Sequence, residues 1–315
     1  MKWTVIPDIH ADAERLLSTL KHAGYRQNGE SFYNDDGHKA LFLGDLIDNG
    51  DQNAEVINIV RGMVEDKQAV CLMGNHELNA IMLHTGHRPK SDKNIKQNRT
   101  FLNEYSSHSS REEVIGWFMT LPIRAEAPGF RASHAFWGDD SIIGAQIEHN
   151  SGLLLNMLPF GELPYINQAS TALSSEISDI LKGPEIVLPG DHFGFYDIYD
   201  FWRSKGRFKW WGGQDGYPTW ESAMMSIGTN PSFPEGAPDP VFTERGYGAH
   251  EKNLFIGHYK MKGDYRQVAP NVICLDYPNI ELYSEVDHDD GIFHVISPDE
   301  GLIFSSNRVE SEPTP

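Results

Sequence analysis

GDLIDNG, residues 44–50, is the stretch of this 315-residue chain that says most about its architecture. It follows the apolar run ALFL at residues 40–43, which predicts a buried strand, and it places Asp45 and Asp48 three residues apart between glycines. A strand that ends in Gly-Asp carries its carboxylate to the rim of a sheet, where α/β proteins bind ligands. A ligand site at Asp45 is expected only if other strands end in groups that could share the ligand.

Several other apolar runs end in side chains that can bind metals. With Asp45, these side chains are Asp8, His10, Asn75, His76, His134 and His258. Oxygen and imidazole donors at one rim of a sheet suit divalent ions such as Mn, Fe(II) or Zn. An aspartate can bridge two such ions about 3.5–4 Å apart, a spacing that suits in-line attack at phosphorus. The ordered set therefore predicts a metal site in which Asp45 is the natural bridge.

Strands and helices are expected to alternate in the first part of the chain. Apolar runs predict strands at 3–10, 38–45 and 68–77, and apolar residues near helical spacing predict helices at 11–25 and 53–65. Further strands are predicted at 130–136, 185–190, 253–260 and 271–277, a helix at 111–121, and an antiparallel meander at 280–286, 291–297 and 301–307. Early β-α-β units followed by hairpins indicate an α/β fold with mixed sheets.

Composition narrows the class of protein. The formal net charge of -19 argues against general binding to nucleic-acid backbones or anionic membranes, because the field of the protein repels polyphosphates. No apolar run approaches about 18 residues and the opening residues do not resemble a signal peptide, so a cytoplasmic location without a membrane span is expected. The two cysteines, Cys71 and Cys274, lie in apolar runs and are expected to be buried thiols.

A change in composition marks residues 183–250, which are rich in Gly, Pro and aromatic residues. We expect one domain over 1–315 in which this segment is an insertion or lid, with a poorly ordered surface as the alternative. Within it, KWWGG at 209–213 would either stack on a base or a peptide aromatic ring, or pack the lid. The GDH turn at 190–192 is expected to be a loop outside the site, and His84 and His87 to be surface residues.

The ordered motifs resemble those of the calcineurin-like metallophosphoesterases, in particular the bacterial branch similar to Ser/Thr phosphoprotein phosphatases and diadenosine tetraphosphatases. The matching motifs extend from Asp8 to His258, but residues 183–250 contain no motif that is diagnostic of the family. It implies a four-layer α/β/β/α sandwich of two mixed sheets, with two divalent ions, Mn or Fe and Zn, at the C-terminal ends of the strands.

The resemblance also implies a role for each matched residue. The ligands would be Asp8 and His10 for the first ion, Asp45 as the bridge, and Asn75, His134 and His258 for the second. His76 and Asp48 would form the catalytic pair, in which Asp48 keeps His76 cationic so that the imidazole can protonate the leaving group.

Departures from the family pattern bear on the substrate. Lys260 stands where many diesterase-type members have a second histidine, which favours monoesters or anhydrides over diesters. Asn49 follows the GDLID aspartate where that branch commonly has an arginine, and no arginine lies close behind GNHE. Because guanidinium groups suit bidentate phosphate contacts, we name three candidates to replace the missing arginines. They are Arg88, Arg207 and Arg245.

The resulting hypothesis is a metal-dependent phosphoesterase in which a metal-bridging hydroxide attacks in line. Its expected substrates are phosphomonoesters, either small molecules or phosphoprotein Ser/Thr side chains. The first alternative is a dinucleoside polyphosphate hydrolase. The second is a metal-stabilised module that binds phosphorylated ligands without turnover, which the missing arginines motivate and the intact Asp48 and His76 pair opposes.

Overall fold

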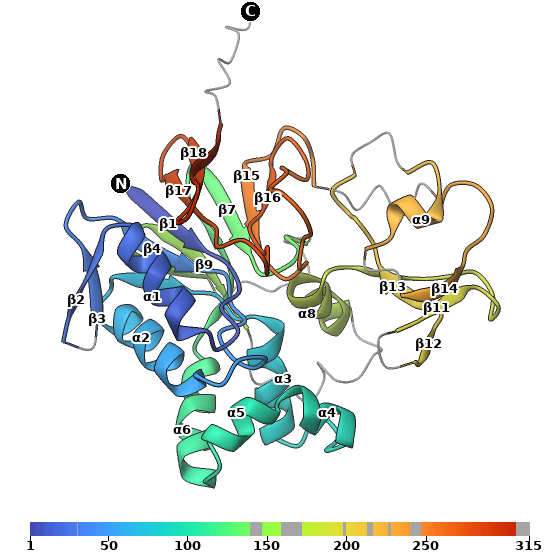
Figure 1. Cartoon of the computed structure of the whole chain (residues 1–315), viewed down its shortest axis with the longest axis horizontal. Coiled ribbons are helices and arrows are strands. Elements are labelled where there is room, and N and C mark those ends of the chain that lie inside the picture. The colour runs from blue at the N-terminus through green and yellow to red at the C-terminus, as the bar shows by residue number, and fades with distance from the viewer. Residues whose placement is uncertain are drawn as a thin grey trace, which may run out of the picture.

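Two six-stranded sheets form the centre of the molecule in this computed structural model (Figure 1). The structure describes residues 1–29, 31–138, 147–158, 172–197, 200–212, 217–225, 228–239 and 247–306. The first sheet has the strand order β19-β18-β17-β1-β4-β5. Its strands are β1 (Lys2–Ile6), β4 (Lys39–Phe42), β5 (Ala69–Cys71), β17 (Tyr283–Asp287), β18 (Phe293–Ser297) and β19 (Gly301–Ser305). β1, β4 and β5 run parallel and the meander β17–β19 is antiparallel, so the sheet is mixed, as predicted.

The second sheet has the order β16-β15-β7-β6-β9-β8 and is also mixed. Its strands are β6 (Pro122–Glu126), β7 (Phe130–Ser133), β8 (Ile147–Asn150), β9 (Leu153–Met157), β15 (Asn253–Ile256) and β16 (Val272–Cys274). β15 is parallel to both β7 and β16, so the carboxyl ends of these three strands reach the same edge of the sheet. The predicted α/β fold with mixed sheets is confirmed at this level.

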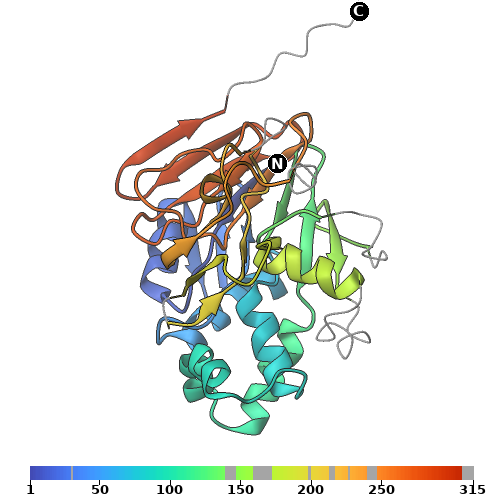
Figure 2. The ribbon, with the colours of Figure 1, turned by 90° about the vertical axis from the view of Figure 1, so that its right-hand side faces the viewer.

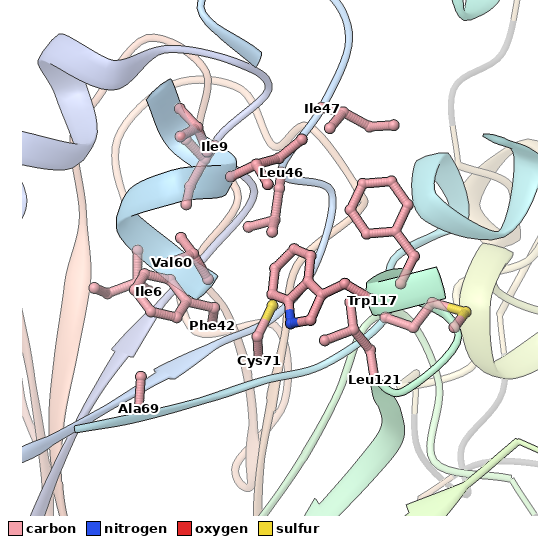
Figure 3. Packing of buried hydrophobic residues seen from close by; sticks show 14 of the residues in the cluster. Ile6, Ile9, Phe42, Leu46, Ile47, Val60, Ala69, Cys71, Trp117 and Leu121 are labelled. Atoms are coloured by element: carbon pink, nitrogen blue, oxygen red, sulfur yellow. The ribbon is translucent and has the colours of Figure 1, made fainter. Parts of the chain in front are cut away.

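Helices surround the two sheets, and several of them cover the outer face of the first sheet (Figure 1). The helices are α1 (Ala13–His22), α2 (Asn53–Glu65), α3 (Asn75–His84), α4 (Asp92–Gln97), α5 (Arg99–Glu104), α6 (His108–Phe118), α8 (Ala172–Lys182) and α9 (Trp220–Ala223), and a hairpin pairs β2 (Tyr25–Asn28) with β3 (Ser31–Asn34). Figure 3 shows how Ile6 and Phe42 pack among Val60 of α2 and Trp117 of α6. Burial of these apolar side chains holds the helices on the sheet.

The parallel strands β1, β4 and β5 are mostly apolar because both of their faces are buried. Along the first sheet, Val5 and Leu41 belong to the core between the two sheets, whereas Ile6 and Phe42 pack under the helices. Such alternation follows from the two-residue repeat of a strand, and burial on both faces explains the continuous run ALFL. From the second sheet, Phe130 contributes to the same inner core and stacks edge-on against Phe255, with the ring centroids 5.8 Å apart.

The described part of residues 183–250 contains several short strands and one short helix. It contains β10 (Glu185–Val187) paired with β13 (Lys205–Arg207), and a three-stranded sheet of β12 (Trp202–Arg203), β11 (Gly194–Tyr196) and β14 (Thr229–Ser232). These strands and α9 stand together at one side of the molecule (Figures 1 and 2).

The KWWGG tryptophans pack into a third core that includes residues of β15 and β16. Trp210 is 1% exposed and its Nε1 donates a hydrogen bond to the Tyr259 hydroxyl over 2.7 Å. Trp211 is also buried and contacts the Tyr259 ring edge-on. Of the two roles that the sequence left open for these tryptophans, packing is therefore the one observed. No helix in the described ranges is both long and apolar enough to cross a membrane.

Candidate metal centre and catalytic pair

The loops that follow the parallel strands meet at one edge of the two sheets. The backbone N–H groups of Ile9 and His10 donate to the carbonyl oxygen of Asp45 over 3.1 and 2.9 Å. The N–H of His258 donates to both carboxylate oxygens of Asp8, at 3.0 and 3.1 Å. Motifs that lie 250 residues apart in the chain are thus joined directly by hydrogen bonds from a backbone N–H group to a side-chain carboxylate.

Asp45 lies at the centre of this assembly and is almost fully buried. Its Oδ2 lies 3.9 Å from Nε2 of His10 and 3.9 Å from Nε2 of His76, and its Oδ1 lies 3.5 Å from Nε2 of His134. Two groups of potential ligand atoms, each within 4.8 Å of one another, share this carboxylate: His10, Asp45 and His76, and Asp45, His134 and His258. A carboxylate common to two groups has the position required of a bridge between two ions.

The other predicted ligands lie beside these groups. Asp8 Oδ2 is 3.9 Å from His10 Nε2, and Asn75 Oδ1 is 3.4 Å from His134 Nε2. The structure therefore brings all six predicted ligands to one place. His76, predicted as the catalytic histidine, is also close enough to His10 and Asp45 to belong to the first group.

Two of the candidate ligand histidines, His10 and His258, are in a state that fits metal binding. Both ring nitrogens of His258 and Nε2 of His10 are buried without a hydrogen-bond partner among the described residues. Burial lowers the pKa of His10 to about 4, and burial together with the charge of Arg207 lowers the pKa of His258 well below its ordinary value. Neutral imidazoles with free lone pairs are the form that coordinates a metal, and leaving them unpaired in a buried site is costly.

The close grouping of buried carboxylates at the site also favours the binding of cations. Burial and the negative charge of Asp276 raise the pKa of Asp8 well above its ordinary value, because several acidic groups are close together away from water. For Asp45, burial has the same tendency but the charges of His134 and His76 outweigh it, so its pKa is lowered. Divalent ions would offset the repulsion between these carboxylates, and this mixed nitrogen and oxygen donor set suits Mn, Fe or Zn.

Asp48 and His76 form a hydrogen-bonded pair. Nδ1 of His76 lies 2.9 Å from Oδ2 of Asp48, which leaves Nε2 of His76 on the side of Asp45. Burial acts to lower the pKa of His76, but the charges of Asp45 and Asp48 outweigh it and raise that pKa. Asn53 accepts a hydrogen bond from the backbone N–H of Asp48 over 2.8 Å and thereby fixes this loop.

The backbone of the site adopts uncommon conformations. Asp45, Asp48, His10 and His258 have φ values of 51°, 68°, 52° and 70°, in the left-handed region that non-glycine residues rarely adopt. Such conformations cost free energy and concentrate at functional sites, where the surrounding structure maintains them. Close packing adds a further constraint, because a side chain at Gly74 would collide with the backbone and carboxylate of Asp45.

Glu77 is an important residue to which the sequence patterns assigned no role. It is completely buried, and its carboxylate accepts hydrogen bonds from the backbone N–H groups of Asp45, Leu46 and Gly74 over 2.8–2.9 Å. It therefore fixes the loop that carries Asp45 against the start of α3. Glu77 is the last residue of the GNHE motif, but the backbone N–H groups that it binds could be identified only in the folded chain.

A cavity of about 1090 Å³ opens beside the metal ligands and is lined in part by Asp45, His76 and His258. Two of the candidate phosphate-binding arginines, Arg88 and Arg207, line it as well. The third, Arg245, lies outside the described residues.

Other residues discussed from the sequence are placed as follows. Lys260 and Asn49 line the cavity, next to the motifs in which they depart from the family pattern. His84, His87 and His192 are not among the described residues that line it. His192 is exposed, as expected for a turn outside the site.

Comparison with known proteins identifies the family. The model of the calcineurin-like phosphoesterases matches residues 1–284, and the chain belongs to this family. The match confirms the family predicted from the motifs.

Curated relatives are named as nucleotide hydrolases. The asymmetrical bis(5'-nucleosyl)-tetraphosphatase PrpE of Halalkalibacterium halodurans is 30% identical over 143 residues, which are 45% of this chain and 56% of the relative. The symmetrical bis(5'-nucleosyl)-tetraphosphatase of Nitrosococcus oceani is 30% identical over 118 residues, 38% of this chain and 37% of the relative. The chain thus covers about half or less of the length of these relatives.

Solved structures include similar chains at low identity. A cold-active protein tyrosine phosphatase has a TM-score of 0.46 at 13% identity, with 96% of this chain and 78% of that chain covered. A protein serine/threonine phosphatase from Saccharomyces cerevisiae has a TM-score of 0.40 at 16% identity, with 95% and 73% covered. TM-scores below 0.5 are too low to support an inference about function.

Proposed function

We propose that this chain hydrolyses phosphate esters with two divalent ions bound where the strands of a four-layer α/β/β/α sandwich end. The main support is the carboxylate of Asp45, which two groups of ligand atoms share and which lies 3.9 Å from Nε2 of the Asp48-paired His76. Asp8 and His10 would hold the first ion, and Asn75, His134 and His258 the second. When bound, such ions lower the pKa of a coordinated water and neutralise phosphoryl oxygens.

The residues of the chain then perform the remaining steps. His76, kept protonated by Asp48 and Asp45, is positioned to donate a proton from Nε2 to the departing alkoxide. Arg88 and Arg207, which line the cavity, would bind phosphate oxygens of the substrate in place of the arginines that the family pattern has next to GDLID and GNHE. Glu77 maintains the position of Asp45 throughout.

Phosphomonoesters are the substrates that we place first, because Lys260 replaces the second histidine of diesterase-type members and leaves the first ion with fewer protein ligands. Dinucleoside polyphosphates are the second candidate, favoured by the names of the curated relatives and by the size of the cavity. A binding module without turnover has less support, since such a module has no need for a proton donor at His76. The single domain, the native metals and a cytoplasmic location stay predictions.

The test compares the wild type with Asp45→Asn and His76→Asn after reconstitution with manganese. Both variants are expected to lose at least about 100-fold in kcat on an aryl phosphate, since one removes the shared ligand and the other the proton donor. An Asp264→Asn variant, changed at an exposed position outside the cavity lining, serves as the control. Full activity of both site variants would rule out the assigned roles.

A further inference from the structure

The cavity beside the metal ligands is rich in basic residues although the chain is strongly acidic. Its basic lining residues are Arg88, Lys93, Lys96, Arg99, Lys182, Arg203, Lys205, Arg207 and Lys260, and its acidic ones are Asp45, Glu185 and Asp197. The formal net charge of the whole chain is -19, so the basic lining of this cavity differs in sign from the protein as a whole. Because Asp45 belongs to the metal site, only Glu185 and Asp197 remain to offset the basic side chains.

Those two acidic groups are already engaged. Glu185 forms a 2.7 Å ion pair with Lys205, and Asp197 accepts a 2.8 Å hydrogen bond from Nε of Arg203. Both pairs lie on the small sheets that β10 to β13 form. Within each pair the acidic and the basic side chain largely neutralise each other. The net positive charge of the cavity lining must therefore come from other side chains.

Three cations of the cavity lining, Arg88, Lys182 and Arg207, contribute to that charge. No salt bridge to Arg88, Lys182 or Arg207 is found within the described ranges. Arg88 bonds only the neutral amide of Gln97, at 2.8 Å, and its Nη1 is buried without a partner among the described residues, as is Nε of Arg207. Buried guanidinium nitrogens without acceptors are costly, and an anion in the cavity would satisfy them.

The three cations are neighbours. Burial lowers the pKa of Lys182, and the charges of Arg88 and Arg207 add to this effect. Arg88 also interacts electrostatically with Asp48, and Arg207 with His258, whereas Lys182 ends α8 directly before β10. Arg88 and Arg207 therefore act both on residues of the candidate site and on Lys182, and all three side chains line the same cavity. In Figure 1, α8 lies between the two large sheets and the strands β11 to β14.

We propose that Arg88, Lys182 and Arg207 form a second anion subsite, which binds a phosphoryl group other than the one that is cleaved. The inference rests on the proposed function and favours the second of its substrate candidates over simple monoesters: small molecules that carry two or more linked phosphates. Ions at Asp45 would already neutralise the reacting phosphoryl group, so with a monoester the three cations are offset by protein carboxylates such as Asp48, which acts on Arg88, and Glu185, which acts on Lys182. A chain of phosphates supplies further negative charge at the distance over which the cluster extends. The cavity volume of about 1090 Å³ lies at the upper end of the usual range for ligand pockets and leaves room for such a chain.

The experiment measures binding without turnover, with phosphonates that the enzyme does not hydrolyse. Calorimetry on the manganese-loaded protein compares methylphosphonate with methylenediphosphonate at one fixed manganese concentration, so that chelation of each phosphonate is the same for the wild type and every variant. The wild type is expected to bind the diphosphonate at least about 30-fold more tightly. Lys182→Met, which retains the length of the side chain but removes its charge, is expected to reduce this ratio about tenfold, as loss of a charged hydrogen bond does.

Two further variants keep the result interpretable. Lys182→Arg should restore most of the ratio, and Lys262→Ala, which removes an exposed lysine outside the cavity lining, should leave the ratio unchanged. A wild-type ratio below about threefold, or an unchanged ratio in Lys182→Met and Arg88→Met, would overturn the subsite. Preferential diphosphonate binding in a protein that releases no phosphate from any substrate would refute only the proposed function. Turnover without that preference would refute only the subsite.

Discussion

Nδ1 of His76 lies 2.9 Å from Oδ2 of Asp48, and both side chains are held next to the carboxylate that two sets of ligand atoms share. The pair resolves why GDLIDNG carries two aspartates. Asp45 points into the candidate metal centre, and Asp48 orients a histidine and favours its protonated form. The positive φ values at both aspartates allow two residues of one short loop to serve these different tasks.

The first prediction concerns the protonation of His76. Asp48→Asn removes a negative charge that raises the pKa of His76, so the imidazole will lose its proton at a lower pH than in the wild type. We expect kcat to fall about 100-fold, and the alkaline limb of the pH profile of kcat to move to lower pH. A pH-rate series on an aryl phosphate measures both effects. Asp51→Asn, at an exposed position in the same loop, is the control, and an unshifted alkaline limb in Asp48→Asn would contradict the assigned pairing.

A second prediction concerns metal content. Asp45→Asn replaces the carboxylate common to both ligand groups, so the affinity for both ions should fall together, by at least about 100-fold. Elemental analysis after equilibrium dialysis against manganese reports the content directly. His10→Ala should weaken mainly one ion, because this histidine belongs to one group only. Equal metal content in Asp45→Asn and the wild type would exclude a bridging role.

Glu77 provides a test of stability rather than chemistry. Glu77→Ala leaves three buried backbone N–H groups without their acceptor, and we expect the metal-free protein to lose about 3 kcal/mol or more in the free energy of unfolding. Urea unfolding followed by circular dichroism measures this quantity. Glu112→Ala, whose side chain is 69% exposed, should change it by less than about 0.5 kcal/mol. Similar values for the two variants would show that Glu77 does not stabilise the loop.

The packing of the 183–250 segment leads to a fourth prediction. Trp210→Ala removes a side chain that is 1% exposed, together with its hydrogen bond to Tyr259, and should cost about 3–5 kcal/mol. Trp202→Ala, at a position that is 39% exposed, should cost much less. Because Tyr259 follows His258, we also expect Trp210→Phe to lower metal affinity. If Trp210→Ala is as stable as Trp202→Ala, the segment does not pack as the structure indicates.

The sequence predicted which candidate metal ligands would lie together better than it predicted the basic residues that line the cavity. Asp8, Asp45 and His134 each follow an apolar strand, and parallel strands bring their carboxyl ends to one edge, so local pattern was sufficient. The central strand β6 was not predicted, because its buried Arg124 interrupts the apolar pattern. Lys182 was not identified as a cavity residue either, because Arg88 and Arg207, which line the same cavity, come from distant segments and no sequence spacing connects the three. Contacts between remote parts of the chain require the folded structure.

The most direct measurement of the central claim is product-resolved hydrolysis by the manganese-reconstituted protein. An aryl phosphate, a phosphopeptide, a phosphodiester and diadenosine tetraphosphate are offered side by side at neutral pH, with the His76→Asn variant in parallel. The account predicts phosphate or nucleotide products from the wild type, little from the diester, and a loss of at least about 100-fold in the variant. No product from any of the four substrates would contradict it.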